Sequence, residues 1–386
     1  MDFSLTAEQR DLQERVRALT RSEIAPRAAE YDRDATFPKE SLADLHDAGL
    51  LGLLLPEPLG GDGADMTTYV TVVSEIAQGC GSTALVYAMH CGATRLASSG
   101  PDPDGGHAAR AEEVVKDGRL FAWAFSEPGT GGNILAPQLA AAPEGDSLVL
   151  NGTKSFCTAA GHADYYLINA HSGEKDFRRS QTLVVLDAAA PGLAVEETWD
   201  GMGMRGNSAH TLRLNRVQVP AQRSVGGHAG GLPLLTQSLA PLILGLAAAS
   251  LGVARAAAAY AKQHVSKRRV QPSGFALADL QAVRMRIADM EATLHQAWLA
   301  LAYGAWVAER DLLEALPAMN TAKYACNTAA LSVADNAMQL CGGQGYQRSN
   351  PLERHYRDAR AGAVMGANLD VLRDMIAKSA LGMDPR

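Results

Sequence analysis

The spacing of apolar residues changes twice along this chain, and this change constrains the fold more than any other feature of the sequence. Up to about residue 100, apolar residues recur every three or four positions, as in Val70, Val73 and Ile76, which predicts helices. Thr6, followed by Gln9 three residues later, predicts a capping box at the start of the first helix. The first part of the chain is therefore predicted to be helical.

The middle part alternates apolar and polar residues with a period of two, which is the pattern of half-buried strands. The clearest runs cover residues 147–150, 165–169, 182–186 and 210–219. Asn151-Gly152 follows the first run, and both residues tolerate the positive φ of a type I′ turn, so a hairpin is predicted there. This part of the chain is predicted to be a β domain.

From about Leu232 the helical period returns, in long Ala- and Leu-rich stretches that are broken only near Pro272 and Pro317. This pattern predicts a helix bundle. The most apolar run, residues 239–253, contains Pro241 and is too short to span a bilayer comfortably. We interpret it as a buried helix of the bundle, and we expect no membrane partner.

The charge and the cysteine pattern exclude several classes of function. The 386 residues carry a net charge of -7 and contain no block of like charges, which argues against a nucleic-acid partner. The five cysteines are odd in number and lack metal-ligand spacing, so neither a disulfide framework nor a metal site is predicted. The N-terminus lacks the basic and apolar regions of a signal peptide. We expect a cytoplasmic protein.

A first candidate site lies in the stretch from Phe125 to Asn133. A proline and several glycines surround a single acid, Glu127, which predicts a rigid turn with exposed backbone N–H groups. Such a turn suits a polar ring edge or a phosphate, although the same composition is typical of a plain surface turn.

A second candidate lies at the end of the run from Asn151 to Thr158. The hydroxyl of Thr158 can donate or accept a hydrogen bond, and Phe156 two residues earlier is predicted to lie on the same face of the strand. Taken alone, one threonine on an alternating strand is typical of ordinary structure.

Five blocks of sequence, in order and over nearly the whole chain, resemble the acyl-CoA dehydrogenase family of flavoenzymes. They cover residues 125–133, 151–158, 201–220, 267–290 and 339–360. The third block is also typical of a hairpin with an edge strand, and we assign it no catalytic role. The resemblance implies an α+β fold, with an N-terminal all-α domain over residues 1–121, a middle β-barrel-like domain over residues 122–228 and a C-terminal four-helix bundle over residues 229–386.

The resemblance also implies FAD as the cofactor. By it, Phe125 and Ser126 face the pyrimidine end of the flavin, while Phe156 and Thr158 lie beside flavin N5. These four residues come from the two candidate stretches already described. The resemblance therefore joins both stretches into one flavin site.

Other parts of the FAD site are also assigned by the resemblance. Gly131 and Gly132 belong to the first loop, and Gly132 stands where family members usually have a serine. Arg268 matches an arginine that reaches a pyrophosphate across a subunit boundary. Three residues match those that approach the adenosine half of FAD from a neighbouring subunit: Gln339, Gly342 and Gly343. A homo-oligomer, either a dimer or a tetramer, is therefore implied.

One family feature is missing near the C-terminus. Where most members carry a Glu-Gly-Thr turn, whose glutamate removes the proton alpha to the thioester, this chain reads Met365-Gly366-Ala367-Asn368. Positioned general-base catalysis is typically worth ~10² to 10⁴-fold, and Gly366 cannot supply it. A subset of the family places the glutamate near the position of Ala240 or Pro241, which are not acids either.

Asp370 and Asp374 follow Gly366 on one helical face and could present a substitute carboxylate. Both are also typical of solvated helix acids. His90, His162 and His264 could carry protons, but a lone histidine is more often a structural residue.

Three functions remain open at this stage. The first is an FAD-dependent oxidoreductase that acts on an acyl thioester, carried by CoA or by a carrier protein, through monooxygenase-like chemistry with O2. The second is an ordinary acyl-CoA dehydrogenase whose base is displaced to Asp370 or elsewhere. The electron acceptor is either O2 or an electron-transfer flavoprotein. The third is a flavin-binding protein with little turnover, against which the retained Thr158 block argues.

Overall fold

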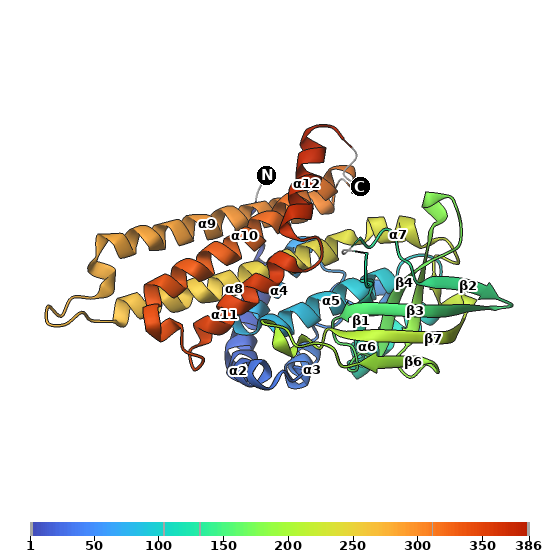
Figure 1. Cartoon of the computed structure of the whole chain (residues 1–386), viewed down its shortest axis with the longest axis horizontal. Coiled ribbons are helices and arrows are strands. Elements are labelled where there is room, and N and C mark those ends of the chain that lie inside the picture. The colour runs from blue at the N-terminus through green and yellow to red at the C-terminus, as the bar shows by residue number, and fades with distance from the viewer. Residues whose placement is uncertain (1–2, 103–104, 131–132, 311, 384–386) are drawn as a thin grey trace.

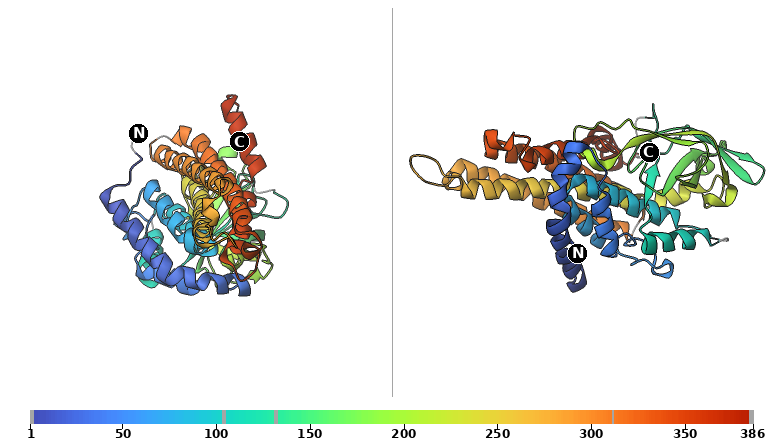
Figure 2. Two further views of the ribbon diagram at one scale, coloured as in Figure 1. Left: turned by 90° about the vertical axis from the view of Figure 1, so that its left-hand side faces the viewer. Right: turned by 90° about the horizontal axis from the view of Figure 1, so that it is seen from below.

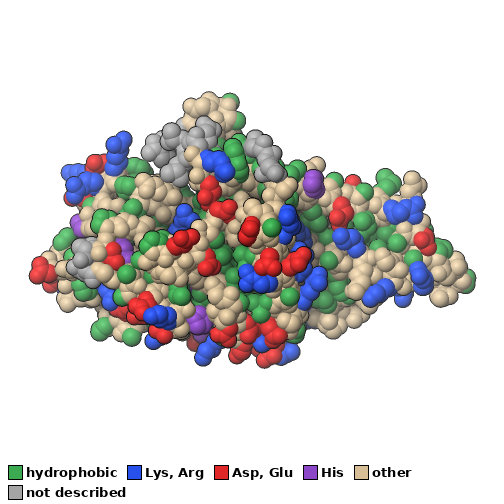
Figure 3. All heavy atoms as spheres, turned by 180° about the vertical axis from the view of Figure 1, so that it is seen from behind, with side chains coloured by type: hydrophobic (Ala, Val, Ile, Leu, Met, Phe, Trp, Pro, Cys, Tyr) green, Lys and Arg blue, Asp and Glu red, His purple; other side chains and the backbone are tan. Residues whose placement is uncertain are grey.

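The computed structural model describes residues 3–102, 105–130, 133–310 and 312–383. A β domain lies at one end of an elongated molecule, and long helices extend away from it toward the other end (Figure 1). Acidic and basic side chains are interspersed on the face in Figure 3, as the sequence without like-charge blocks leads one to expect.

The N-terminal part is helical, as predicted. Its helices are α1 (Ala7–Leu19), α2 (Ala25–Asp34), α3 (Lys39–Asp47), α4 (Met66–Gly79), α5 (Gly81–Ala97) and α6 (Gly106–Asp117). The capping box is confirmed, because Thr6 Oγ1 accepts from the Gln9 N–H at 3.2 Å and Gln9 Oε1 accepts from the Thr6 N–H at 3.0 Å. The N-terminal helices lie across the long C-terminal helices (Figure 2).

The middle part is a mostly antiparallel sheet. Its strands are β1 (Phe121–Ala124), β2 (Ala140–Glu144), β3 (Ser147–Cys157), β4 (Tyr165–His171), β5 (Gln181–Asp187), β6 (Leu193–Glu196), β7 (His210–Pro220) and β8 (Ser224–Val225). The strand order is β6-β7-β3-β2-β4-β5-β8, and β1 pairs in parallel with β4. β2 follows β3 along its length but pairs with β4 only at Ala140 and His171, so the sheet divides into two halves that meet at β2.

The hairpin predicted at Asn151-Gly152 is wrong. Both residues lie inside β3, and the turn falls earlier, at Gly145-Asp146 between the paired residues Glu144 and Ser147. Gly152 instead has φ +147°, at a register shift between β3 and β7. The positive φ that an Asn-Gly pair permits serves a β-bulge here rather than a turn.

The helices of the C-terminal part are α7 (Gly231–Gln237), α8 (Leu239–Lys267), α9 (Gln281–Ala308), α10 (Leu312–Gly345), α11 (Pro351–Val364) and α12 (Leu369–Ala380). Four of them, α8 to α11, form the predicted four-helix bundle. The break near Pro272 is confirmed, because α8 ends at Lys267 and α9 begins at Gln281. The break at Pro317 is wrong, since this proline lies within α10 and the chain breaks earlier, between Ala308 and Leu312.

α8 is the central helix of the molecule. It has the length and apolar composition of a membrane-spanning helix, yet 72% of its most apolar window is buried inside the protein. It packs against α4 and α5 from the N-terminal part and against α9, α10 and α11 of the bundle. The fold class predicted from the sequence is thus confirmed: helices, then a β domain, then a helix bundle around one shared core.

Candidate active site

The two motifs that were predicted to bind flavin are joined by a buried ion pair. Lys154 Nζ lies 2.6 Å from Glu127 Oε1, and the two side chains are 0% and 3% exposed. The ammonium also donates to Asn169 Oδ1 at 2.9 Å. Burial lowers the pKa of Lys154, and the hydrogen bond that its ammonium donates to Glu127 opposes that shift. A buried charge is tolerated only with such partners, so the pair fixes the strand against the loop.

Glu127 also closes its own loop. Its carboxylate accepts the N–H of Gln138 at 2.6 Å and the N–H of Leu139 at 3.1 Å, on the far side of the loop that begins at Ser126. Two backbone donors and one ammonium therefore converge on one carboxylate. Glu127 therefore links the start of the loop to its end at Gln138 and Leu139. In the sequence alone it was recognised only as a single acid within a turn.

Next to this pair lies the surface formed by Phe125, Ser126, Ser155 and Phe156, which we call the flavin surface because the resemblance assigns the cofactor to this stretch. The carbonyl of Ser126 accepts the Ser155 N–H at 2.8 Å, which brings β3 against the loop. The Phe156 ring is 69% exposed, and the buried Ser155 Oγ has no hydrogen-bond partner within the described ranges. Phe125 is buried edge-on against Trp123, with ring centroids 4.6 Å apart. An exposed ring beside an unsatisfied buried hydroxyl suits the isoalloxazine of FAD.

The predicted shared face of Phe156 and Thr158 does not hold. β3 has a register shift between Lys154 and Cys157, and Phe156 has φ +53°. Thr158 follows the end of the strand and is 8% exposed, while Phe156 is exposed. The bulge breaks the period-two alternation on which the prediction depended. Gly131 and Gly132 lie outside the described residues.

The other residues assigned to FAD lie far from this surface within one chain. The loop between α8 and α9, which contains Arg268, and the turn between α10 and α11 lie toward the end of the bundle away from the β domain (Figure 1). Arg268, Gln339, Gly342 and Gly343 are all exposed. They are not brought together with Phe125 and Ser126, so only another copy of the chain could supply them to that surface.

The turn around Gly366 is held by a buried lysine that the sequence analysis missed. Lys323 is 1% exposed, and its Nζ donates to the carbonyls of Met365 at 3.0 Å and Ala367 at 2.8 Å. These carbonyls flank Gly366, which has φ +61°. A Cβ on Gly366 would lie 3.7 Å from Lys323 Cε and 3.0 Å from Leu246 Cδ1. Burial lowers the pKa of Lys323 to about 8.

Lys323 belongs to a polar stripe on the buried face of α10. Asn320, Lys323 and Asn327 are spaced by three and four residues and are each at most 2% exposed. Asn327 Nδ2 donates to the carbonyl of Gly362 near the end of α11 at 2.8 Å. Polar residues at helical spacing within an Ala-rich helix are the signal that could have predicted this contact. Together, Lys323 and Asn327 hold the end of α11 and the following turn.

The acids near this turn point to solvent. Asp370 is 88% exposed in its side chain and pairs with Arg373 at 2.9 Å, and Asp374 pairs with Lys378 at 2.9 Å. Ala240 is buried at the start of α8. Over the part of the chain that the structure describes, the charged side chain that hydrogen-bonds the turn is the Lys323 ammonium.

The histidines have structural environments. His90 is fully buried, its Nδ1 accepts the Phe121 N–H at 3.1 Å, and its Nε2 lies 3.0 Å from the carbonyl of Leu51. Burial lowers its pKa to about 4, so it stays neutral near pH 7. His162 stacks on Phe37, with ring centroids 4.1 Å apart, and burial lowers its pKa as it does for His264.

Comparison with known proteins identifies the family. Three models match in chain order: "Acyl-CoA dehydrogenase, N-terminal domain" over residues 6–102, the middle domain over 122–217 and the C-terminal domain over 229–381. The "Cyclohex-1-ene-1-carbonyl-CoA dehydrogenase" of Syntrophus aciditrophicus is 31% identical, over 98% of this chain and 91% of that protein. The chain belongs to the acyl-CoA dehydrogenase family. It is therefore a flavin-dependent oxidoreductase, and its cofactor is FAD.

Further family members match over similar lengths. The human mitochondrial "Short-chain specific acyl-CoA dehydrogenase" is 30% identical, over 94% of this chain and 87% of that protein. Among solved structures, butyryl-CoA dehydrogenase from Megasphaera elsdenii has a TM-score of 0.92 at 26% identity, covering 99% of this chain and all of that one. A glutaryl-coenzyme A dehydrogenase in complex with glutaryl-CoA has a TM-score of 0.93, also at 26% identity, over 100% and 98% of the two chains.

Proposed function

We propose that this chain acts on an acyl thioester, carried by CoA or a carrier protein, without the usual base. Its flavin, once reduced by an external two-electron donor, would react with O2 in monooxygenase-like chemistry, in which one oxygen atom enters the thioester and the other leaves as water. The names of the relatives supply the substrate class, because each names a CoA thioester or an acyl-CoA. This chain's own residues are the reason to expect a reaction other than dehydrogenation.

The observation that carries the proposal is the composition of the Gly366 turn. Gly366 has no side chain, and the charged group that contacts its flanking carbonyls is the ammonium of Lys323. Removal of a proton alpha to a thioester needs a basic group within hydrogen-bond reach of that carbon. With a pKa lowered to about 8, Lys323 is mostly protonated at pH 7, and the Nζ of this 1% exposed residue is directed at two backbone carbonyls rather than at a substrate. Among the described residues, the contacts of this turn therefore argue against abstraction of an alpha proton by a side chain of the turn.

The flavin surface keeps the parts that cofactor binding needs. When bound, FAD supplies a ring that accepts hydride and that, once reduced, can react with O2. Phe125 and Ser126 would hold one edge of this ring, and Phe156 would cover a face, because its own ring is 69% exposed. Thr158 would contribute a hydroxyl beside it. The Glu127–Lys154 pair would keep both stretches in place.

A second copy of the chain is part of this proposal. Arg268, Gln339, Gly342 and Gly343 are exposed at the end of the bundle away from the flavin surface. If they bind FAD, they bind it for a neighbour, so the protein would be a dimer or a tetramer with shared sites. The residues on both sides of such a site would then depend on assembly.

The alternative is an ordinary α,β-dehydrogenase that transfers electrons to an electron-transfer flavoprotein. The names of the relatives favour this alternative, because they name dehydrogenases. The candidate base for this alternative, Asp370, opposes it: its side chain is 88% exposed and paired with Arg373. A non-catalytic flavin-binding role remains the third alternative.

Product analysis tests the proposal. The flavin-loaded protein is reduced anaerobically with dithionite, freed of excess reductant, and mixed with isotopically labelled O2 and a panel of acyl thioesters. We expect a thioester product that contains one labelled oxygen atom. Loss of two hydrogens from butyryl- or octanoyl-CoA with a dye acceptor would contradict the proposal and favour the dehydrogenase. Purified protein that is colourless and gains no flavin on incubation would favour the non-catalytic role.

A further inference from the structure

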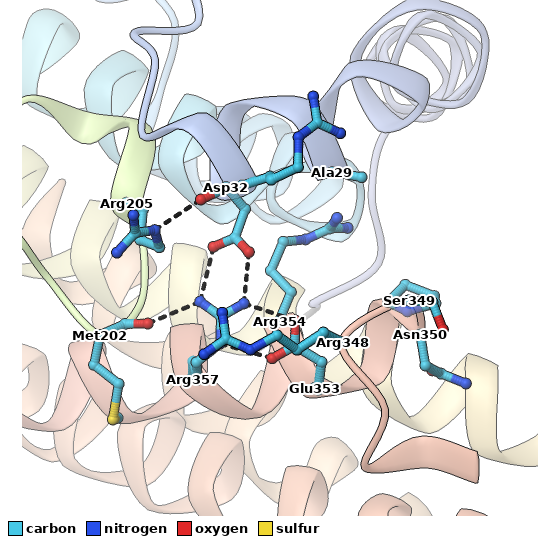
Figure 4. Close-up of a pocket in the computed structure, with 12 residues that line it drawn as sticks. Ala29, Asp32, Met202, Arg205, Arg348, Ser349, Asn350, Glu353, Arg354 and Arg357 are labelled. Atoms are coloured by element: carbon cyan, nitrogen blue, oxygen red, sulfur yellow. Dashed lines mark hydrogen bonds and ion pairs between the residues drawn. The ribbon is translucent and has the colours of Figure 1, made fainter.

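A separate, arginine-lined pocket lies between α2, the loop before β7 and the start of α11 (Figure 4). Its volume is about 670 Å³. The charged residues that line it are five arginines and two acids: Arg33, Arg205, Arg348, Arg354, Arg357, Asp32 and Glu353. Two of these arginines pair with acids beside the pocket, Arg33 with Asp34 at 2.6 Å and Arg205 with Asp200 at 3.3 Å. Five arginines against four acids leave an excess of one positive charge. None of these residues belongs to the flavin surface or to the Gly366 turn.

Both acids of the pocket are paired with Arg357. Its two terminal nitrogens donate to the Asp32 carboxylate at 2.8 and 2.5 Å, and its Nε and one terminal nitrogen donate to Glu353 at 2.8 Å each. These hydrogen bonds raise the pKa of Arg357. Figure 4 shows Asp32 and Glu353 on either side of this guanidinium. With Arg33 and Arg205 also paired, the arginines of the pocket that form no ion pair within the described residues are Arg348 and Arg354.

Arg354 is the arginine that most needs a partner. It is 9% exposed, and its buried Nε has no hydrogen-bond partner among residues that the structure describes. In Figure 4 its side chain rises from α11 toward α2, across the space between Asp32 and Ala29. Asp358, one turn further along α11, interacts with Arg354 electrostatically but leaves this Nε without a hydrogen-bond partner. A buried donor without an acceptor is costly, whereas a bound oxyanion would accept its N–H. Its guanidinium is positioned to bind an anion.

Two further features favour an anion at the same place. The pocket includes the N-terminus of α11, a helix of 14 residues, where Asn350 caps the Leu352 N–H. The partial positive charge of this helix end favours an anion nearby. Its N–H groups are already used, because Leu352 and Glu353 both donate to Asn350, so the hydrogen bonds to a ligand would come from the arginines. Arg348 lines the same pocket and is exposed. Cation, dipole and rim arginine thus surround one cavity.

We propose that this pocket binds a phosphate-type oxyanion, with Arg354 as its buried ligand and Arg348 as its rim ligand. Guanidinium groups bind phosphate oxygens through paired hydrogen bonds, and two arginines of one pocket, Arg348 and Arg354, form no ion pair among the described residues, which suits a phosphate group better than one carboxylate. The source of the phosphate is either a free inorganic anion or the phosphate end of a nucleotide. Inorganic pyrophosphate and ADP serve as the two probes.

Calorimetric titration of the flavin-loaded, assembled protein tests this proposal. We expect saturable binding of pyrophosphate without release of flavin. The Arg354→Met variant should weaken that binding at least about tenfold, because a charge-assisted contact is lost. The Arg348→Gln variant, at an exposed position, should weaken it about two- to fivefold. Arg213→Gln is the matched control, since Arg213 is 56% exposed in its side chain and pairs with Glu196 in the β domain. It should bind as the unchanged protein does.

Each other outcome is informative. Tighter binding of ADP than of pyrophosphate, with the same loss in Arg354→Met, would assign the phosphate to a nucleotide. Flavin release on titration would overturn the proposal, because the anion would then compete for the cofactor site. No binding, or binding that both arginine variants retain, would also overturn it. Dissociation of the assembly in Arg348→Gln without any pyrophosphate binding would identify the pocket as a subunit contact instead. If Arg354→Met fails to fold, Arg348→Gln against Arg213→Gln still decides.

Discussion

Lys154 Nζ lies 2.6 Å from Glu127 Oε1, in a pair that is almost completely buried. This contact turns two separate sequence motifs into one structural unit. Glu127 organises the loop through the N–H groups of Gln138 and Leu139, while Lys154 holds the strand that carries Phe156. Both halves of the flavin surface therefore depend on one ion pair.

Removing one partner of this pair should unfold the flavin surface. Lys154→Met leaves the Glu127 carboxylate buried and unpaired, which should cost about 3–5 kcal/mol in the free energy of unfolding. Flavin content should fall with it. Urea denaturation and flavin absorbance measure the two effects. The double variant Glu127→Gln/Lys154→Met should be less destabilised than the sum of the single variants; strict additivity would show that the two side chains do not act as a pair.

Restoring a carboxylate at the turn should create dehydrogenase activity. Gly366→Glu should raise dye-linked desaturation of an acyl-CoA at least about 10²-fold over the unchanged protein. The positive φ of Gly366 should make the variant about 1–3 kcal/mol less stable, and Leu246 must shift slightly. Gly366→Gln has the same size without the charge and should show no gain. Equal desaturation by both variants would contradict the account.

Asp370 should be dispensable. Its side chain is exposed and paired with Arg373, so Asp370→Asn should change the free energy of unfolding by no more than about 0.5 kcal/mol and leave turnover unchanged. Asp374→Asn is the matched control on the same helix. A large loss of turnover in Asp370→Asn alone, with flavin content intact, would instead identify Asp370 as a displaced base.

Lys323 should make stability depend on pH in a defined direction. Burial lowers its folded-state pKa to about 8, below the ordinary value of 10.5. Between these values the unfolded chain binds more protons than the folded chain, so the contribution of Lys323 to the free energy of unfolding rises with pH. Below about pH 8 the full cost of burying the protonated ammonium is present. The neutral amine keeps two N–H groups for the carbonyls of Met365 and Ala367.

Urea denaturation at pH 7 and at pH 9.5 measures this effect. The stability of the unchanged protein relative to Lys323→Met should increase with pH. Lys262→Met is the control, because Lys262 is 47% exposed in its side chain and pairs with Glu291. A Lys323→Met difference that does not change with pH, or that shrinks as pH rises, would contradict the buried position assigned to Lys323.

The sequence predicted the order of the domains because periodicity is a property of each element by itself. The helical spacing of Val70, Val73 and Ile76 and the capping box of Thr6 depend on neighbours within one element, and both are confirmed. The hairpin predicted at Asn151-Gly152 is wrong, because strand pairing is not a property of one element by itself. Local chemistry permits a positive φ there, but pairing with β7 decides whether the positive φ makes a turn or a bulge.

The candidate site was predicted less completely, because its key contacts join distant parts of the chain. Glu127 and Lys154 both stood within quoted motifs, yet nothing local says that they meet. Lys323 lies far along the sequence from Gly366, and only the packing of α10 against α11 and α12 brings them together. The roles assigned to Arg268 and Gln339 stay predictions, since they require a second chain.

The most direct test of the central claim is exchange of the alpha hydrogens of a bound thioester with solvent. The flavin-loaded protein is incubated with butyryl- and octanoyl-CoA in D2O, and deuterium at the alpha carbon is followed by mass spectrometry, with Gly366→Glu as the positive control. The account predicts no incorporation above the uncatalysed rate for the unchanged protein and clear incorporation for Gly366→Glu. Rapid incorporation by the unchanged protein would show that a base reaches the alpha carbon, and would contradict the account.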